Sequence, residues 1–439
     1  MVNRIIVVAA LLLIAACSQD TGEATHVAVP KSAPAASIDD LAKRYLVLEL
    51  SMGEVAPGHV DAYFGPDEFY TQAKEIGLGL NAIKVASGEL EAKLLEMDTS
   101  GDAVLANRVE GLLARLLALN TRIALKEGEV IAFDDEVERQ FATSLAPVEP
   151  GYFDSVLAEI DALVPGEGPL NERVDAFLDG FNIPPEKLAE VFNTALEECK
   201  RRTLEFMELP AGESFTVEYV TDKPWSGYNW YQGDSASLIQ INTDLPSRIN
   251  SAVTLGCHEG YPGHHVYNTL LEQNMVDGMG WLEFSLYPLF SPQSLIAEGS
   301  GNYGIDLAFP GEERIEYEKN VLFPMAGLDP DTAGDFYRLL ELQDKLSFSR
   351  NEAARAYLNG EADAEQTIEQ LMKYSLTTRK RAEQSLSFIE TYRSYVINYN
   401  HGKAMVAAYI ERGTNSPAER WAKFETMLST SMLPKDLEN

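Results

Sequence analysis

The stretch of residues 256–268 constrains the fold more than any other part of the chain. It reads Gly-Cys-His-Glu-Gly-Tyr-Pro-Gly-His-His-Val-Tyr-Asn and holds three of the six histidines of the 439-residue sequence. Histidines gathered around a carboxylate predict a metal site with a general base, as in the zinc-binding His-Glu-x-x-His helix. There the histidines bind zinc and the glutamate acts as the base. We therefore expect His258 to bind Zn²⁺ and Glu259 to be the base.

The spacing of these histidines does not fit one straight helix. His264 lies six positions after His258, which at about 3.6 residues per turn places the two rings on different faces. His265 returns to the face of His258, but ~10 Å further along the axis. Pro262 lacks an N–H and Gly263 adds backbone freedom, so a break here can bring a later histidine back beside His258. This reasoning leaves both His264 and His265 open as the second ligand.

Glu298 is the single acid in an otherwise apolar helix predicted for residues 284–305. An ionised carboxylate in such a helix costs several kcal/mol unless it is paired or bound to a metal. Because a catalytic zinc typically takes three protein ligands, Glu298 is the predicted third. Asn302 and Asp306 follow as candidate partners of a ligand histidine. Small residues should let this helix approach the histidine segment: Gly299, Gly301 and Gly304.

The motif His-Glu-x-Tyr-Pro-Gly-His-His resembles the signature of a bacterial family catalogued as domain of unknown function 885. Residues 57–66 resemble a second recurrent segment of that family. The family is similar to thermolysin-like zinc peptidases, with helical relatives such as the carboxypeptidase Taq group. The resemblance implies that His264, directly after Pro-Gly, is the second ligand, with His265 as a neighbour that contacts substrate. It also implies a ligand glutamate in a Glu-Gly segment, here Glu298, although Ser300 replaces the family's usual tryptophan.

The last long predicted helix, residues 378–411, contributes further candidates. Tyr395 and Tyr399 are four positions apart and share a helix face, and His401 follows. The segment resembles a Tyr-x-x-Gly-Lys-type helix of the same family. Zinc peptidases need a donor for the oxyanion that forms when water attacks an amide. We expect Tyr399 and His401 to be the catalytic donors and Tyr395 to contact substrate.

The remaining pattern is mostly helical, apart from one small β region. Alternating residues predict strands at 214–219 and 237–242, and the aromatic, glycine-rich segment 224–233 should turn the chain between them. In thermolysin-like peptidases an edge strand at this place binds the substrate backbone, so Ile239 and Gln240 are expected substrate contacts. The predicted fold class is mainly α: one large helical domain with a small β hairpin or sheet beside the metal-binding helix. The other predicted helices cover residues 37–51, 80–97, 103–126, 134–143, 153–163, 184–209, 312–325, 330–358 and 364–375.

The first seventeen residues are a predicted lipoprotein signal peptide. A basic start precedes an apolar run too short for a comfortable membrane span. The run ends in Ile-Ala-Ala-Cys, which resembles a lipoprotein cleavage box with Cys17 as the lipidated residue, and Ser18 suggests outer-membrane sorting. The alternative is an uncleaved anchor or an ordinary signal peptide. Residues 18–36 read as a flexible tether and 37–439 as the helical metallohydrolase domain.

Charge and cysteine content narrow the functional classes. With 35 basic and 68 acidic residues the chain carries a net charge of −33, which excludes nucleic acid as a partner. No second apolar run reaches membrane length, so membrane contact is expected through the lipid anchor alone. Cys199 and Cys257 could pair in an oxidising compartment, but they do not make a disulfide scaffold.

The sequence therefore predicts a lipid-anchored zinc metallohydrolase on the periplasmic side of the cell envelope, with peptides as its substrates. Two alternatives stay open. The first is a non-catalytic lipoprotein that binds peptides or cell-wall fragments in the same cleft. The second is a zinc amidase or esterase.

Overall fold

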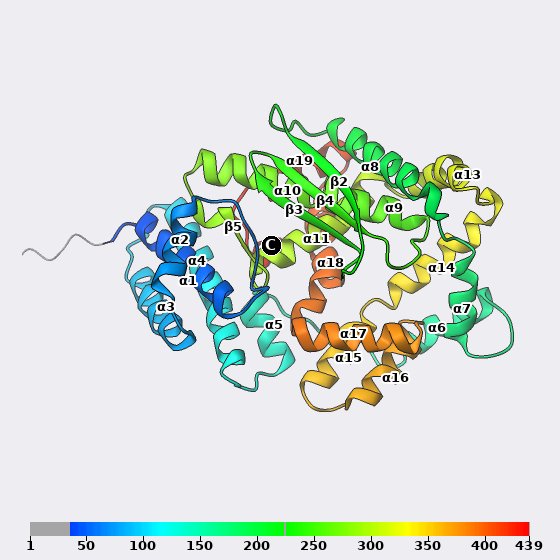
Figure 1. Cartoon of the computed structure of the whole chain (residues 1–439), viewed down its shortest axis with the longest axis horizontal. Helices are drawn as coiled ribbons and strands as arrows, with labels where there is room; N and C mark the ends of the chain where they lie inside the picture. Colours follow the sequence, from blue (N-terminus) through cyan, green and yellow to red (C-terminus); the bar gives the residue numbers. More distant parts are fainter. Residues whose placement is uncertain (1–35, 224, 439) are drawn as a thin grey trace, which may run out of the picture. The chain divides into compact units, whose positions relative to one another are not determined.

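Helices dominate the computed structural model, which describes residues 36–223 and 225–438 (Figure 1). The predicted mainly α fold class is confirmed, because the strands of the described residues form only two small sheets. From Ile38 onward the chain forms one compact unit. The predicted signal peptide, with Cys17, and most of the predicted tether lie outside the described residues.

The first half of the chain is built from α1 (Ile38–Val55), α2 (Asp67–Ile76), α3 (Leu80–Leu95), α4 (Ala103–Lys126), α5 (Phe133–Phe141), α6 (Tyr152–Leu163), α7 (Leu170–Asp179) and α8 (Leu188–Leu204). Local chemistry sets several of these ends. The side chain of Asp102 caps α4 by accepting a hydrogen bond from the backbone of Leu105. α2 ends at Gly77, whose left-handed conformation suits a residue without a side chain.

Three strands form a sheet beside the histidine segment: β2 (Ser214–Val220), β3 (Gly227–Gly233) and β4 (Ala236–Asn242). The strand order is β2-β4-β3, with β4 parallel to β2 and antiparallel to β3. The segment predicted as a turn therefore contains a strand. Its aromatic residues alternate between the two faces, with Tyr231 buried and Trp230 exposed, and the tight turn to β4 falls later, at Asp234 and Ser235, which have positive φ.

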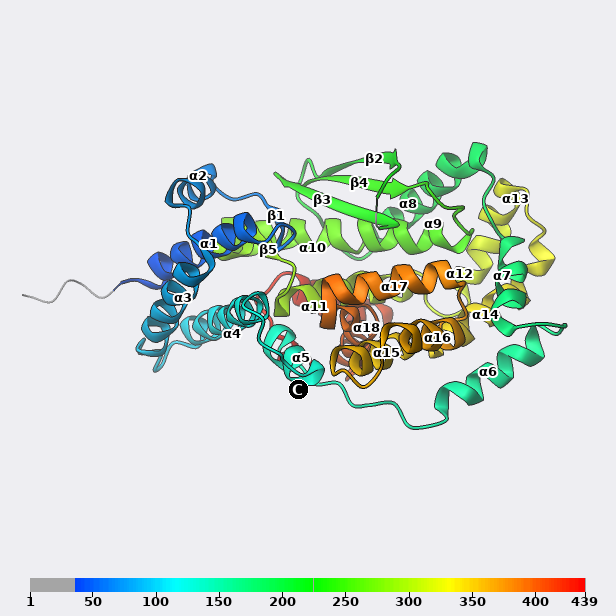
Figure 2. The same ribbon diagram turned by 60° about the horizontal axis from the view of Figure 1, so that its bottom comes forward.

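The histidine segment is a helix interrupted in its middle. α9 (Asn250–Leu255) runs into a π-helical turn at Gly256–Gly260, and α10 (His264–Leu271) begins after a bend. The predicted break at residues 261–263 is therefore present, and the Tyr261–Pro262 peptide bond is cis. The three-stranded sheet lies on one side of this segment, while α17 (Arg379–Tyr392) and α18 (Ile397–Glu411) lie on the other (Figure 2).

The second half is again helical, with α11 (Pro292–Ala308), α12 (Glu313–Tyr317), α13 (Phe323–Ala326), α14 (Ala333–Lys345), α15 (Ser349–Leu358), α16 (Ala364–Tyr374), α17 (Arg379–Tyr392), α18 (Ile397–Glu411) and α19 (Pro417–Leu428). Two long predicted helices are each divided, at 346–348 and at 393–396. The helix predicted from residue 284 begins later, at Pro292. A short strand before it, β5 (Leu286–Pro288), pairs with β1 (Val60–Tyr63).

Candidate metal centre

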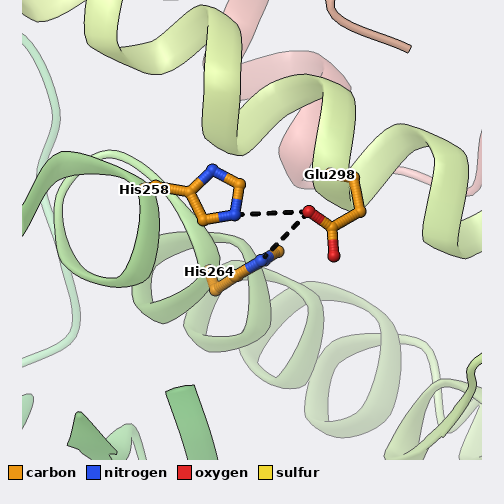
Figure 3. A group of neighbouring side chains, drawn as sticks. All are labelled: His258, His264 and Glu298. Atoms are coloured by element: carbon orange, nitrogen blue, oxygen red, sulfur yellow. Dashed lines mark ion pairs between the residues drawn. The ribbon is translucent and has the colours of Figure 1, made fainter. Parts of the chain in front are cut away.

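The side chains of His258, His264 and Glu298 converge on one point (Figure 3). Nε2 of His258 lies 3.2 Å and Nε2 of His264 lies 3.9 Å from Oε2 of Glu298. One nitrogen from each ring and one carboxylate oxygen lie within 4.8 Å of one another. Of the three residues, His258 and Glu298 are buried, and His264 is partly exposed. The structure therefore brings together the three residues that the sequence predicted as ligands.

The interrupted helix explains how two histidines six positions apart come side by side. Their ring centroids lie 4.6 Å apart, and the rings are nearly perpendicular. The backbone N–H of Gly263 donates to the carbonyl of Cys257, which closes the bend. A Cβ at Gly263 would lie 1.8 Å from the carbonyl oxygen of His258, so only glycine fits there. The bend thus depends on backbone atoms packing closer than any side chain allows.

Glycines let α11 lie directly against the histidine segment. A Cβ at Gly301 would come within 2.8 Å of Nδ1 of His258, and one at Gly304 within 2.8 Å of Pro262. Gly299 faces another partner, because its Cβ would lie 2.5 Å from the backbone of Gly402 in α18. The prediction that small residues allow close approach is therefore correct for Gly301 and Gly304, while Gly299 serves the contact with α18.

The donor atoms suit a divalent cation. Oε1 of Glu298 accepts a hydrogen bond of 2.8 Å from the hydroxyl of Tyr395, but the buried Oε2, which faces the rings, has no hydrogen-bond partner among the described residues. Burial and the charge of His258 lower the pKa of His264 to about 4, so this ring is neutral and offers a lone pair. Two imidazoles and a carboxylate fit Zn²⁺ better than ions that prefer oxygen alone.

The pKa of His258 shifts in the opposite direction and is raised. Burial by itself lowers its pKa, but the neighbouring carboxylates of Glu298 and Glu259 outweigh burial and raise the pKa to about 9. Without a metal, a proton on His258 balances part of the negative charge of the two glutamates. A divalent cation held by the same residues would provide this balance in place of the proton.

Glu259 lies beside the three candidate ligands and is buried. A Cβ at Gly227 would lie 3.0 Å from its Oε1, so the glycine of β3 makes room for the carboxylate. The side chain of Asn229 donates a 2.7 Å hydrogen bond to the backbone carbonyl of Glu259. Burial, with smaller contributions from Glu298 and Asp61, raises the pKa of Glu259 to about 7 although the charge of His258 opposes the shift. A carboxylate with this pKa can both accept and return a proton near neutral pH.

These residues line a cavity of about 490 Å³. Its walls come from β1, from the start of β3 with Trp225 and Ser226 before it, and from the tyrosines of α17 and α18. Sequence reasoning missed Asp61 of β1, which lines the cavity and whose pKa burial and Glu298 raise to about 7. The loop motif around residues 57–66 was noted, but nothing in it marks Asp61 as a cleft residue.

The predicted substrate contacts Ile239 and Gln240 are wrong. Both belong to β4, the central strand, whose two edges are already hydrogen-bonded to β2 and β3. Ile239 is buried in the core, and Gln240 donates to Glu218 on β2. The strand at the cavity is β3, which pairs only with β4 among the described residues. The strand that lines the cavity is therefore β3, which was not predicted, and not β4.

Two predicted site histidines point elsewhere. His265 is fully buried, with Nδ1 2.8 Å from the hydroxyl of Ser237 and Nε2 3.0 Å from the carboxylate of Glu213. His401 lies 3.1 Å from the hydroxyl of Thr143 and does not line the cavity. Burial lowers the pKa of His401 to about 4. Neither ring can contact a substrate at this cavity, so the predictions of substrate contact for His265 and catalysis for His401 are wrong.

The two predicted tyrosines of the C-terminal region do line the cavity. Tyr395 bonds Glu298, so its role is to hold the candidate ligand. The ring of Tyr399 packs edge-on against Tyr395, with centroids 5.8 Å apart, and its hydroxyl lies within electrostatic range of Glu298 and Glu259. Asn302 also lines the cavity and donates to the backbone of Tyr399. Asp306 instead forms an ion pair with Lys403 and does not support a histidine.

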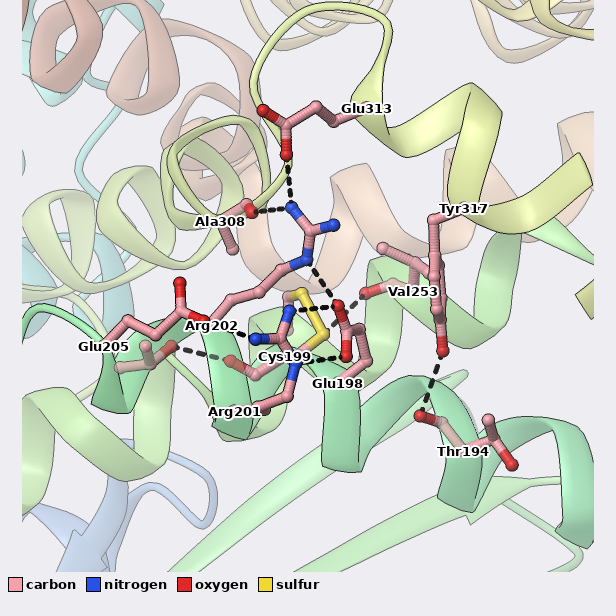
Figure 4. Close-up of polar contacts among 12 residues, drawn as sticks. Thr194, Glu198, Cys199, Arg201, Arg202, Glu205, Val253, Ala308, Glu313 and Tyr317 are labelled. Carbon is pink, nitrogen blue, oxygen red and sulfur yellow. Dashed lines mark hydrogen bonds and ion pairs between the residues drawn. A yellow bond between two sulfur atoms is a disulfide. The ribbon is translucent and has the colours of Figure 1, made fainter. Parts of the chain in front are cut away.

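A disulfide and a set of polar contacts fix both ligand-bearing segments to α8 (Figure 4). Cys199 of α8 is bonded to Cys257, the residue before His258. Arg202, one turn further along α8, donates to the carbonyl of Ala308 at the end of α11 and pairs with Glu313. The open question of the two cysteines is thus answered: they pair, and the bond ties the π-helical turn to its neighbour.

The described chain is thus a mainly α protein with a candidate centre of two histidines and one glutamate. No protein-family model and no curated protein matches the sequence, so the resemblance to the domain 885 family stays a prediction. Two solved structures, each described as a "putative lipoprotein", are similar. One, from Colwellia psychrerythraea, is 15% identical with a TM-score of 0.50 over 82% of this chain and 67% of that chain. The other, from Shewanella oneidensis and of unknown function, is 12% identical with a TM-score of 0.47 over 92% and 87%. At this identity, the Colwellia structure shows similarity of fold alone.

Proposed function

We propose that the protein is a zinc-dependent hydrolase that cleaves peptides. One observation carries the proposal: two imidazole nitrogens and a carboxylate oxygen meet within 4.8 Å in a cavity, with the buried carboxylate of Glu259 beside them. His258, His264 and Glu298 would hold the ion. Three protein ligands that border a cavity would suit a catalytic rather than a structural zinc site.

Each surrounding residue has a distinct chemical task. A bound zinc ion supplies Lewis acidity, which makes water more acidic and polarises a carbonyl group. Glu259 accepts a proton at its carboxylate and returns it to the leaving amine, for which its raised pKa is suited. The hydroxyl of Tyr395 fixes the orientation of Glu298. Tyr399 offers an O–H donor from the wall of the cavity to an oxygen that gains negative charge.

The start of β3 offers a place for the substrate backbone. Gly227, Tyr228 and Asn229 line the cavity, and the edge of β3 that faces away from β4 is unpaired among the described residues. An extended peptide can add to such an edge through main-chain hydrogen bonds. This addition would place a peptide bond beside Glu259, whose carboxylate lies against Gly227.

The cell envelope is the proposed location. The predicted lipidation of Cys17 would anchor the protein, and the similar proteins from Colwellia and Shewanella carry the description of lipoproteins. The disulfide between Cys199 and Cys257 agrees with an oxidising compartment. Among the described residues, no helix combines the length and the apolar character needed to cross a bilayer.

Metal analysis followed by peptide cleavage tests the proposal. Protein purified without chelators should contain one zinc per chain, and it should cleave a library of short peptides. Treatment with a chelator should abolish cleavage, and added zinc should restore it. Stoichiometric zinc without turnover of any peptide would favour a non-catalytic binding protein, and turnover of amides or esters alone would favour an amidase or esterase.

A further inference from the structure

Arg350 stands where two cavities meet. It lies near the start of α15 and lines the cavity of the candidate metal centre as well as a second cavity of about 840 Å³. Thr254, Asn302 and Tyr399 also line both, so the two cavities are neighbours. The side chain of Arg350 remains accessible to solvent. A molecule bound at the metal centre can therefore extend toward this guanidinium.

No acidic side chain in the described part of the chain pairs with Arg350. Among the described residues, its guanidinium takes part in no ion pair and no hydrogen bond. The contrast with nearby arginines is clear, because Arg355 on the same helix pairs with Asp134 and Glu352, and Arg338 pairs with Glu159 and Glu341. In a chain with 68 acidic residues, an arginine that faces a cavity without a carboxylate partner is unusual.

The surroundings of Arg350 favour an anion. Burial in the cleft lowers the pKa of Arg350, and the phenol of Tyr399 lies within electrostatic range of its guanidinium. Tyr399 is in turn within electrostatic range of Glu298 and Glu259. Arg350 therefore lines the same cavity as these carboxylates. A bound anion would stabilise the positive charge of Arg350, which has no carboxylate partner among the described residues.

We propose that Arg350 binds a carboxylate of the substrate, so that the favoured peptides carry a free carboxyl group close to the cleaved bond. The proposal rests on the proposed function and specifies its substrate class. A guanidinium binds a carboxylate through two parallel N–H···O bonds, which fixes orientation as well as charge. The carboxylate comes either from the C-terminus of a short peptide or from an acidic side chain next to the bond.

A binding experiment separates this proposal from catalysis. It uses the Glu259→Gln protein and three pools of tetrapeptides: free acids, the same peptides as C-terminal amides, and amides that end in glutamate. Equilibrium dialysis followed by mass spectrometry measures the retention of each pool. We expect the free acids, the glutamate amides or both to bind about tenfold to a hundredfold more tightly than the plain amides. Tighter binding of the free acids indicates that the C-terminus supplies the carboxylate. Tighter binding of the glutamate amides indicates that an acidic side chain supplies it.

Substitutions at Arg350 complete the test. Arg350→Gln, added to the Glu259→Gln protein, should remove the preference for peptides with a free carboxylate. Arg350→Lys should keep part of this preference because the charge remains. Lys345→Gln is the matched control, since it removes an exposed positive charge outside both cavities. The proposal is wrong if all three pools bind equally, if none is retained, or if the preference survives Arg350→Gln. The wild-type protein is tested in the same way. If it prefers peptides with a free carboxylate but cleaves none of the pools, the hydrolase proposal is wrong and the carboxylate-binding proposal is supported.

Discussion

Gly301 faces His258 so closely that a Cβ on the glycine would lie 2.8 Å from Nδ1 and 2.9 Å from Cε1 of the imidazole. The other nitrogen of the same ring, Nε2, lies 3.2 Å from Glu298, which is also on α11. One helix therefore supplies both the surface on which the ring lies and the carboxylate toward which it points. The position of His258 depends on the absence of a side chain at Gly301.

Replacing Gly301 by alanine should weaken zinc binding. The new methyl group must displace the ring of His258, and misplacing one ligand is expected to lower zinc affinity about tenfold to a hundredfold. Competition with a chromophoric chelator measures the change. Gly88→Ala in α3 is the control, because a Cβ there meets nothing within 4 Å. Equal zinc affinity in the two variants would contradict the assignment of His258 as a ligand.

Tyr395→Phe should lower zinc affinity without disturbing the fold. The substitution removes the 2.8 Å hydrogen bond to Oε1 of Glu298, so the carboxylate loses its fixed orientation. Loss of such an outer partner typically costs about 10- to 100-fold in metal affinity or activity. Tyr392→Phe serves as the comparison, since Tyr392 lines the same cavity without bonding Glu298. If both variants bind zinc like the wild type, the hydrogen bond has no role in the site.

Glu259→Gln should separate zinc binding from turnover. Glutamine keeps the shape of the side chain but cannot take up a proton, so we expect kcat to fall about a hundredfold to ten-thousandfold. Zinc content should stay at the wild-type level, because Glu259 is not among the three converging residues. Steady-state cleavage of the best library peptide and metal analysis of the same sample give both values. Full activity in this variant would remove Glu259 as the base.

The stability of the metal-free protein should depend on Glu259 in a pH-dependent way. Burial first, then Glu298 and Asp61, raise its pKa from 4.5 to about 7, so ionisation above pH 4.5 progressively disfavours the folded state until pH 7. Glu259→Gln should therefore stabilise chelator-treated protein, and the gain should grow by about 1–2 kcal/mol between pH 5.5 and 8. Urea unfolding at both pH values measures this gain. The exposed Glu167→Gln should show no such growth; a pH-independent gain at Glu259 would show that its carboxylate is not destabilised by burial.

Removing the disulfide should loosen the metal centre. The Cys199–Cys257 bond closes a loop with a sequence separation of 58, for which chain entropy gives about 4 kcal/mol of stabilisation. We expect the double variant Cys199→Ser/Cys257→Ser to lose about 2–4 kcal/mol of unfolding free energy and to bind zinc more weakly. Wild-type protein treated with a reductant should behave in the same way. If the reduced and oxidised forms do not differ, the bond is not needed to hold the π-helical turn.

Local chemistry made part of the centre predictable. Pro262 and Gly263 marked the break in the helix because their backbone properties act within a few residues. Glu298 stood out because an acid in an apolar helix needs a partner. The bounds of α4 agree with the helix 103–126 that was predicted from periodicity.

The rest depended on contacts between distant segments. His265 and His401 looked like site residues by type and proximity in sequence, but Glu213 and Thr143, which bind them, lie far away along the chain. The strand order was equally hidden, because alternation marks a strand without telling which edge remains free. Asp61 faces the cavity only because β1 pairs with β5, a contact across more than two hundred residues.

The bond between Cys199 and Cys257 also affects when, after synthesis, the candidate metal centre is fully assembled. In the reducing cytoplasm a newly made copy would keep both thiols free, so the turn that carries His258 would be tied to α8 by packing alone. Closure of the bond after export would complete the support of that histidine. The proposed peptidase would thereby bind zinc less firmly while it is still among the peptides of the cell that makes it.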